Sequence, residues 1–434
     1  MNQIIDFEKS LNPEVLFQDT LKVFDICNGC RRCFNLCPSF DFLFKKIDAR
    51  DGEIDQLETK EIDRTVDLCY YCKLCYNHCP YTPPHRFNLD FPLLMIRSKA
   101  VRAKSVSPSF RDRLLANTDF LGKWSSLFAP MVNWGQKNSF FRKILHSLMG
   151  IHQEKLLPTF SQTTFPDWFT THQFKNLKSS SSPPAEKVAL FSTCFINYNQ
   201  PEIGAATVEV LEKNGVEVSY PEQNCCGMPY FDTGDFEKIR KKAWFNIQSL
   251  KASISQGMKI VVPMPTCSLM LKKEYTTLFP GEDSQLVASN TYDLCEYLMK
   301  LNDQGKLDTN FKQNPGKIFY QIPCHLRDQN IGYKSRDLMK LTGASVNISE
   351  RCSGHDGTWS VKKEYFDLSL KIGDTLFKNV QEEPPDIVCT DCPLSGLQME
   401  QGTGKKSLHP IQVIHQAYGL DRINGGRNEK ASIG

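Results

Sequence analysis

The chain has 434 residues, a formal net charge of +3 and an apolar fraction of 40%. This length suggests about three domains, and the composition is that of an ordinary globular protein. The small charge gives no indication of a nucleic-acid partner. No apolar run of about 18 residues, the length that spans a membrane, occurs. Residues 1–26 also lack the continuous apolar core of a signal peptide.

The first predicted element is a helix before Cys27, where apolar residues recur at helical spacing. It leads into the first of several closely spaced cysteine groups, which together hold most of the 17 cysteines. Grouped cysteines favour metal ligation in a reducing compartment over disulfides. We therefore expect a cytoplasmic protein, free or held peripherally on the inner face of the cell membrane.

Two stretches repeat the spacing C-x2-C-x2-C-x3-C-P, which is the bacterial ferredoxin signature. They cover residues 27–38 and 69–80. Three cysteines of one copy wrap three corners of a 4Fe–4S cube, whereas the fourth lies too far along and ligates the other cube. The two predicted cluster ligand sets are Cys27, Cys30, Cys33 and Cys79, and Cys69, Cys72, Cys75 and Cys37.

Structural zinc is the alternative for these cysteines. Zinc sites pair two C-x2-C segments across a longer gap, and three cysteines in succession do not suit that arrangement. We therefore predict an α-helical ferredoxin module with two 4Fe–4S clusters over residues 1–95. A polar segment at 48–63 and a short helix at 63–68 separate its motifs, as in the helical ferredoxin modules of multi-subunit redox enzymes.

Residues 96–184 are predicted to form a helical connector that ends in a Ser/Pro linker at 178–184. Its first part is basic and includes Arg97, Arg102 and Arg111. This stretch could dock an acidic partner or anionic lipid, or it could form a solvated helix face.

Farther along the connector, residues 140–149 place apolar side chains opposite Arg142, Lys143 and His146. This pattern predicts an amphipathic helix. The helix and the aromatic segment before it could lie on a membrane surface, form a partner interface or pack internally.

Residues 185–310 and 311–420 contain two copies of one α/β unit. Each copy begins with an apolar, β-rich run that ends in a cysteine, at 187–194 and at 317–324. A helical pattern closed by glycine and a second strand follow, which predicts a parallel βαβ unit. The polar tail at 421–434 is predicted to be disordered. The fold class is thus α+β multidomain, with a helical ferredoxin module followed by two pseudo-symmetric α/β cysteine-rich repeats.

Both repeats place cysteines at the C-terminal ends of parallel strands, where open α/β sheets build their sites. Two equivalent sets of four thiolates indicate two metal sites. The predicted ligands are Cys194, Cys225, Cys226 and Cys267 in the first repeat, and Cys324, Cys352, Cys389 and Cys392 in the second. The remaining cysteine, Cys295, lies in a helical pattern and is predicted to be a core residue.

The sequence Cys225-Cys226-Gly227 resembles the cysteine-rich repeat of heterodisulfide reductase-related iron–sulfur proteins. Further stretches, including 265–270 and 362–365, match that family in order over nearly the whole chain. The resemblance implies a non-catalytic electron-transfer subunit of an oxidoreductase. Such a subunit takes electrons from an FAD-containing dehydrogenase partner and passes them toward quinone. It also implies one or two further iron–sulfur clusters in the repeats.

Two residues depart from the family pattern. Met264 stands where the first cysteine of the closing C-x-x-C is expected, and Arg351 where the first cysteine of the second pair is expected. In heterodisulfide reductase, five cysteines per repeat hold a cluster that does thiol chemistry, so four per repeat favour an ordinary cluster. The alternative functions are a thiol–disulfide reductase, an electron carrier to a peroxide-detoxifying partner, and a redox sensor or scaffold with structural clusters.

Two histidines follow predicted ligands: His325 comes directly after Cys324, and His355 comes three residues after Cys352. Each could ligate iron, tune a cluster by hydrogen bonding or be a polar residue of a glycine-rich turn. The stretch 402–407 lacks the first glycine of a phosphate loop. No nucleotide is therefore expected to bind directly, and the flavin is expected on the partner.

Overall fold

The computed structural model describes residue 7, residues 9–176 and residues 186–420. The predicted Ser/Pro linker at 178–184 and the predicted disordered tail at 421–434 lie outside these residues.

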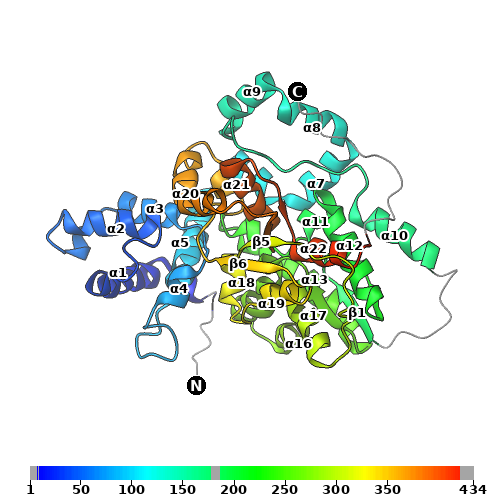
Figure 1. Cartoon of the computed structure of the whole chain (residues 1–434). Helices are drawn as coiled ribbons and strands as arrows, with labels where there is room; N and C mark the ends of the chain where they lie inside the picture. The colour runs from blue at the N-terminus through cyan, green and yellow to red at the C-terminus, as the bar shows by residue number, and fades with distance from the viewer. Residues whose placement is uncertain (1–6, 8, 177–185, 421–434) are drawn as a thin grey trace.

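Figure 1 shows a helical N-terminal lobe that projects from a larger body, with α8 (Ala129–Lys137) and α9 (Ser139–Met149) at the top. The body holds two small sheets among many helices. The predicted α+β architecture, with a helical lobe before two α/β repeats, is therefore confirmed. The domain boundaries stay predictions, and the one at residue 95 falls inside helix α5 (Phe91–Ser105).

The N-terminal lobe consists of helices around a core of aliphatic and phenylalanine side chains. Its first helix, α1 (Pro13–Cys30), begins after Asn12, whose side chain caps the first turn, and ends where Arg31 adopts a left-handed conformation. Phe24 and Phe40 are fully buried in the core and both stack near Phe91. The remaining elements are η2 (Ile54–Gln56), α2 (Pro38–Asp48), α3 (Thr59–Leu68), α4 (Leu74–His78) and α5, with η1 (Lys9–Leu11) preceding α1.

The arginines of the basic stretch bind groups within the chain. Arg97 pairs with Asp19 of α1 at 2.7 Å, and Arg111 pairs with Glu364 of the second repeat, also at 2.7 Å. Arg102 pairs with Asp67 of α3. These three residues therefore fix the connector against the lobe and the second repeat, whereas Lys104 and Arg113 of the same stretch are exposed.

The connector contains α6 (Phe110–Ala116), α7 (Thr118–Leu127), α8, α9 and α10 (Phe165–Asn176). Helix α9 forms as predicted, but its apolar side chains Phe140 and Leu148 are exposed, whereas Arg142 is buried. The Arg142 guanidinium donates to the carbonyls of His152 at 2.7 Å and Gln153 at 2.9 Å. The apolar face is thus divided, because Leu145 and Met149 line an internal cavity while Phe140 and Leu148 are exposed, and α9 packs internally along only part of that face.

Each repeat contains a four-stranded parallel sheet, and the two sheets have the same strand order: β2-β1-β3-β4 and β6-β5-β7-β8. The predicted strands all form, and a short fourth strand that the pattern did not reveal completes each sheet. The strands are β1 (Glu186–Leu190), β2 (Val216–Ser219), β3 (Lys259–Val262), β4 (Thr291–Asp293), β5 (Lys317–Gln321), β6 (Ser345–Ser349), β7 (Ile387–Thr390) and β8 (Ser407–Leu408).

Helices cover both sheets and join them into one apolar core. In the first repeat they are α11 (Cys194–Tyr198), α12 (Pro201–Lys213), η3 (Met228–Tyr230), α13 (Phe236–Ser255), α14 (Pro265–Leu269), η4 (Met270–Glu274), α15 (Tyr275–Leu278), α16 (Glu282–Asn290) and α17 (Leu294–Asp303). In the second they are α18 (Cys324–Asp328), α19 (Lys334–Lys340), η5 (Trp359–Val361), α20 (Phe366–Glu382), α21 (Pro393–Thr403) and α22 (Pro410–Ala417). Cys295 is fully buried on α17, as predicted for a core residue.

His409 joins the two repeats, and its buried neutral ring predicts that the protein loses stability in acid. Its Nε2–H donates to the Pro263 carbonyl at 2.8 Å, and its Nδ1 accepts from the Ile411 N–H at 3.1 Å. Both contacts suit the neutral ring, and burial lowers the pKa of His409 to about 4. The unfolded chain, with a pKa of about 6.5, therefore binds the proton more readily. Stability should fall between about pH 6.5 and pH 4, by on the order of 3 kcal/mol from this residue.

Denaturant unfolding measured across this pH range for His409→Asn and the parent checks the prediction. Asparagine retains an acceptor for the Ile411 N–H and cannot be protonated. The variant should be less stable at pH 7 and should lose less stability on acidification. Equal acid losses in the two proteins would contradict the prediction.

Candidate metal centres

The first predicted ligand set lies at the end of α1. Cys27 and Cys30 stand on its last turn, Cys33 follows in the turn after Arg31, and Cys79 arrives from the end of α4. Burial raises the pKa of Cys27, and the charges of Cys33, Cys79 and Cys30 raise it further. The structure thus brings these four sulfurs together. Cys27 and Cys30 come from one helix, and Cys79 comes from the second motif.

The second set forms where α2, α3 and α4 meet. Cys37 is the residue before α2, Cys69 ends α3 and Cys75 lies in α4. Burial raises the pKa of the Cys75 thiol, and the charges of Cys69 and Cys37 add to the effect. Cys72 completes the set and lies near Cys75 and Cys37 as well.

In the first repeat the structure brings all four predicted cysteines together. The Cys226 and Cys267 sulfurs are 3.3 Å apart. Hydrogen bonds with the Cys194 and Cys226 thiols lower the pKa of Cys225, although burial acts against them. The Cys225 N–H donates to Asp119 of α7 at 3.0 Å, so the connector also holds this site.

In the second repeat the structure brings only three predicted cysteines together. Burial raises the pKa of Cys324, and the charges of Cys352 and Cys392 raise it further. The Cys389 sulfur instead faces the buried Met339 sulfur, 3.7 Å away in the core. The predicted ligand set of the second repeat is therefore corrected to three cysteines, without Cys389.

Strand register explains why Cys389 lies apart. The repeat match that pairs Lys187 with Lys317 also pairs Leu190 with Tyr320. Leu190 lies opposite Val261 in its sheet, and Tyr320 lies opposite Cys389 in the other. Cys389 therefore corresponds to Val261, a buried residue in the middle of a strand.

In the same comparison of the two repeats, Cys392 corresponds to Met264. Both residues directly precede a helix that begins with proline, α14 in the first repeat and α21 in the second. Three residues farther along, Cys267 corresponds to Ser395. Each repeat thus lacks a different member of the closing cysteine pair, since Met264 replaces the first in one copy and Ser395 replaces the second in the other.

The donor sets fit multi-iron clusters better than single ions. All 17 cysteines are free, and buried thiols raise one another's pKa when no cation lies between them. Sulfurs around one zinc ion lie roughly 4 Å apart. Among the described residues, only Asp293, Cys295 and Asp391 place three ligand atoms within 4.8 Å of one another. No three sulfurs of a predicted cysteine set in the described chain meet this limit, although the Cys226 and Cys267 sulfurs are 3.3 Å apart.

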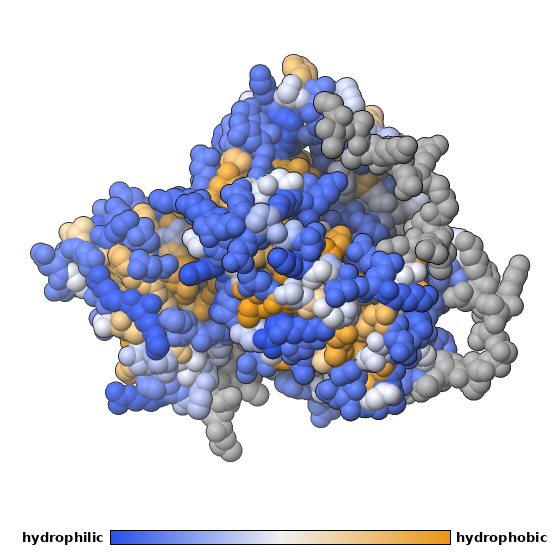
Figure 2. Space-filling view, viewed as in Figure 1, coloured by the Kyte–Doolittle hydropathy of each residue, from blue (hydrophilic) through white to orange (hydrophobic). Residues whose placement is uncertain are grey.

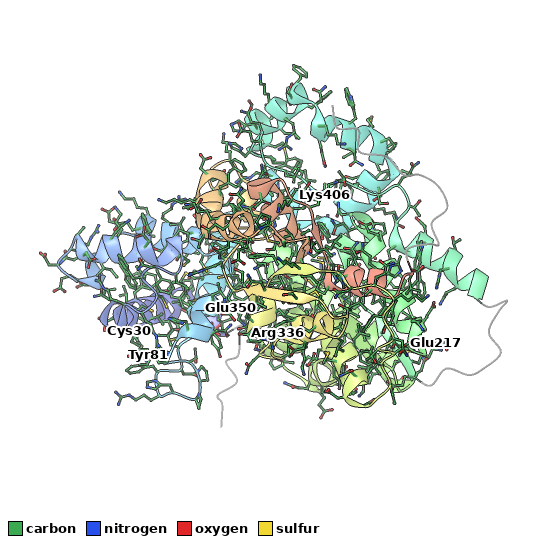
Figure 3. All side chains as sticks on the ribbon, in the orientation of Figure 1. Cys30, Tyr81, Glu217, Arg336, Glu350 and Lys406 are labelled. Carbon is green, nitrogen blue, oxygen red and sulfur yellow. The ribbon has the colours of Figure 1, made fainter. Side chains whose placement is uncertain are left out.

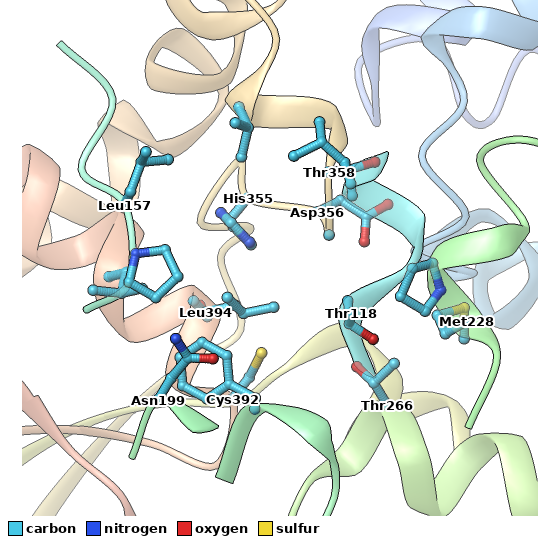
Figure 4. Close-up of a pocket in the computed structure, with 18 of the residues that line it drawn as sticks. Thr118, Leu157, Asn199, Met228, Thr266, His355, Asp356, Thr358, Cys392 and Leu394 are labelled. Atoms are coloured by element: carbon cyan, nitrogen blue, oxygen red, sulfur yellow. The ribbon is translucent and has the colours of Figure 1, made fainter. Parts of the chain in front are cut away.

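A cavity of about 580 Å³ lies between the repeats and the connector. Cysteines of both repeats border it, and Cys72 of the lobe reaches it as well. Apolar side chains of the connector cover its other wall; they include Leu121, Val132, Phe141, Ile144, Leu145 and Leu157. Figure 4 shows His355, Asp356 and Cys392 around the open space.

The two histidines near predicted ligands differ in their contacts. Both ring nitrogens of the buried His325 have partners: Nδ1 lies 2.9 Å from Thr266 Oγ1, and Nε2 lies 2.9 Å from the Tyr71 carbonyl. His355 Nδ1 lies 3.0 Å from Ser360 Oγ, whereas its Nε2, shielded from solvent, has no hydrogen-bond partner among the described residues.

A buried ionic junction fixes the second ferredoxin loop against both repeats. Lys73 Nζ lies 2.6 Å from Glu274 of the first repeat and 3.6 Å from Asp328 of the second. Tyr71 donates its hydroxyl to Glu274 at 2.7 Å. Burial alone would lower the pKa of Lys73, but the charges of Glu274 and Asp328 outweigh it and raise the pKa.

Sequence reasoning missed several polar residues at these sites. Asp119 and Lys155 come from connector segments without metal-ligand spacing; Asp119 accepts the Cys225 N–H, and Lys155 lines the cavity, as does Asp356 of the Cys352 loop. Lys155 is buried, and burial lowers its pKa to about 7.

The cysteine-rich domain model CCG matches residues 188–272 and 318–400. The Fer4-like domain model of citrate utilization protein B matches residues 20–106. Each repeat and the N-terminal lobe thus matches a described domain, in the order that the sequence analysis predicted.

Among curated proteins, a subunit of the anaerobic glycerol-3-phosphate dehydrogenase of Escherichia coli (strain K12) is 29% identical over 327 residues, which is 74% of this chain and 81% of that protein. Lactate utilization protein A of Geobacillus thermodenitrificans is 30% identical over 55% of this chain and 100% of that protein. The Bacillus pumilus protein of the same name is 32% identical over 53% and 97%.

Replacing Lys73 with methionine should destabilise the protein strongly. The change leaves Glu274, which is 2% exposed, without its cation at 2.6 Å, while the equally buried Asp328 keeps, within the described chain, only Lys273 at 3.4 Å. Removing one partner of a buried ion pair costs about 3–5 kcal/mol. Chemical denaturation of the holoprotein measures the loss.

The matched control is Lys187→Met, which breaks a pair with Glu217 in which both side chains are 44% exposed. That pair should contribute about 0–1 kcal/mol. Similar losses in the two variants would show that the junction does not hold the lobe in place.

Proposed function

Because the chain belongs to the iron–sulfur protein family with paired cysteine-rich domains, we propose that it is the electron-transfer subunit of a dehydrogenase complex. It takes electrons from an FAD-containing partner that oxidises a 2-hydroxy acid or glycerol 3-phosphate, and it passes them toward quinone. Homology to a subunit of anaerobic glycerol-3-phosphate dehydrogenase and to lactate utilization protein A supports this proposal.

The observation that carries the proposal is the continuity of the cysteine sites from the lobe to the cavity. Cys72 of the second ferredoxin set lies near Cys324 and Cys352 of the second repeat. The Tyr70 hydroxyl is 3.7 Å from the Cys352 sulfur, and its ring packs on Trp359. Clusters held by these residues would be close neighbours, which is what stepwise electron transfer needs.

The first ferredoxin set is the proposed entry point for electrons. Figure 3 shows Cys30 and Tyr81 in the projecting lobe, away from Glu217 at the far edge of the first sheet. A flavoprotein that contacts this lobe would reduce the first cluster, and the second cluster would then lead inward. The cavity between the repeats is the proposed exit site.

The family's disulfide chemistry is less well supported as the function of this cavity. Met264 and Ser395 each remove a thiolate from the closing pair of a repeat, and Arg351 removes another from the second repeat. The largely apolar wall from the connector suits a lipid-soluble carrier such as a quinone better than a charged thiol.

The outer faces of α7, α8 and α9 form the proposed membrane-docking surface. Figure 2 shows a few apolar side chains among hydrophilic ones at the top of the molecule, where α9 lies. No helix among the described residues has the length and hydropathy to cross a bilayer. The exposed apolar residues are Phe120, Trp124, Leu127, Phe128, Met131, Trp134, Phe140, Phe141, Ile144 and Leu148.

Exposed lysines accompany these aromatic residues: Lys123, Lys137 and Lys143. Tryptophan beside lysine suits the boundary between acyl chains and anionic headgroups. The same helices form the apolar wall of the cavity on their inner side, so docking would bring the cavity to the membrane, where a quinone resides.

Replacing single cysteines with serine should distinguish the predicted cluster ligands from Cys389, which lies in the core. Cys352→Ser and Cys392→Ser should each lose about four iron atoms per chain. Cys389→Ser, buried but directed at Met339, should keep the full iron content. Iron and sulfide analysis of anaerobically purified protein, with an electron paramagnetic resonance spectrum of each variant, provides the measurement. Loss of iron from Cys389→Ser alone would reverse the corrected assignment.

The triple variant Trp124→Ser, Leu127→Ser and Met131→Ser should bind anionic lipid vesicles at least about tenfold more weakly than the parent, because it loses buried apolar area. Co-sedimentation with phosphatidylglycerol vesicles measures the difference. Trp244→Ser is the control, since Trp244 is 61% exposed but lies on α13. Equal binding by all three proteins would refute the docking surface.

A further inference from the structure

We infer that His355 supplies the fourth protein ligand, through Nε2, to the iron–sulfur cluster held by Cys324, Cys352 and Cys392. This inference rests on the proposed function, which requires a cluster in the second repeat. It assigns a ligand that neither the cysteine spacing nor the domain matches reveal.

The ligand count motivates the search for a further residue. A 4Fe–4S cube has four iron corners, and the structure gathers three cysteines at this site. Arg351 carries a fixed positive charge and cannot bind iron. The Ser395 hydroxyl donates to Gln321 Oε1 at 2.9 Å and is thereby engaged.

His355 has the geometry that a ligand histidine needs. Its Nδ1 faces the hydroxyl of Ser360, a fully buried residue, at 3.0 Å. A proton on Nδ1 donated to that hydroxyl leaves the lone pair on Nε2, and such a hydrogen bond commonly fixes the tautomer of a metal-bound histidine. Nε2 is shielded from solvent and has no other partner in the described chain. A buried polar atom without a partner is costly unless a ligand completes it.

The position of His355 also suits the cluster. Cys352 and His355 form a C-x2-H pair on one loop, the same separation as between ligands of the ferredoxin motifs. Figure 4 shows the His355 ring and the Cys392 sulfur directed into the same space. The neighbouring Asp356 lies near Asp232 and Lys99, and its charge also raises the pKa of Cys324, Cys352 and Cys392, so its carboxylate lies close to the same three thiols.

His325 provides a natural comparison within the same cavity. It follows Cys324 directly, but Thr266 and the Tyr71 carbonyl occupy both of its ring nitrogens. Sequence position alone does not separate the two histidines, whereas their hydrogen bonds do. The structure assigns the ligand role to His355 and a positioning role to His325.

The test uses the full-length holoprotein, purified anaerobically with natural-abundance or ¹⁵N-labelled histidine. Pulsed electron paramagnetic resonance of the reduced protein should show a histidine nitrogen coupled to one cluster. The coupling should change between the natural-abundance and the ¹⁵N-labelled samples. His355→Cys should keep the iron, lose this coupling and lower the midpoint potential of that cluster alone, because a thiolate adds negative charge. His355→Ala should lose the coupling and lose iron from that cluster. His325→Asn should keep the coupling.

The outcomes separate the inference from the proposed function. If Cys352→Ser loses iron but the parent shows no histidine coupling, the second repeat holds a cluster and the assignment of His355 is overturned alone. If Cys352→Ser loses no iron, the cluster itself is absent and both fail. Coupling that persists in His355→Cys and disappears in His325→Asn would transfer the role to His325 and overturn the inference.

Discussion

The arrangement of this protein depends on a lysine placed between two cluster cysteines. Lys73 is in the ferredoxin loop, has a left-handed conformation, and pairs with carboxylates from both repeats. Moving three charged groups out of water is costly, and only close pairing and hydrogen bonds offset that cost. The two ion pairs of Lys73 therefore form together in one relative placement of the lobe and the two repeats. This placement sets Cys72 beside Cys324 and Cys352.

The thiols impose a second, related constraint. Burial and neighbouring sulfurs raise the pKa of these cysteines, so their thiolate forms are disfavoured until a cation lies between them. Iron binding and folding of these loops are accordingly linked, because the metal favours the compact arrangement that brings the sulfurs together. The lysine junction orients the module from outside, and bound clusters would hold it from within. Apolar packing adds a third attachment, since Leu68 and Tyr70 of the lobe pack against Trp359 and Tyr365 of the second repeat.

Much of this organisation could be predicted from the sequence, since it follows from local spacing. The ferredoxin motifs fix their own crossed pairing, and the apolar runs before Cys194 and Cys324 become β1 and β5. Cys389 shows where local reasoning ends. It lies three residues before Cys392 and so imitates a C-x-x-C pair, but the strand register directs it into the core. Only the pairing of distant strands contains that information.

Helix α9 shows the same limit in another form. Periodicity locates its apolar face but does not say what that face contacts. The interior position goes to Arg142, because three backbone carbonyls of the following loop offer acceptors to one guanidinium. His355 could not be told from His325 for a similar reason, since the difference lies in hydrogen bonds to Ser360, Thr266 and Tyr71.

The charges of the two repeat sites point to a direction for electron flow. The first repeat offers four thiolates to its cluster, whereas the second offers three and, on our inference, a neutral imidazole. Arg351 adds a positive charge at the border of the cavity. Fewer negative ligands and nearby cations stabilise the reduced, more negative state of a cluster. The second repeat also adjoins the ferredoxin set that contains Cys72. Its cluster would therefore attract electrons from the lobe and hold them at the cavity, where the acceptor is reduced.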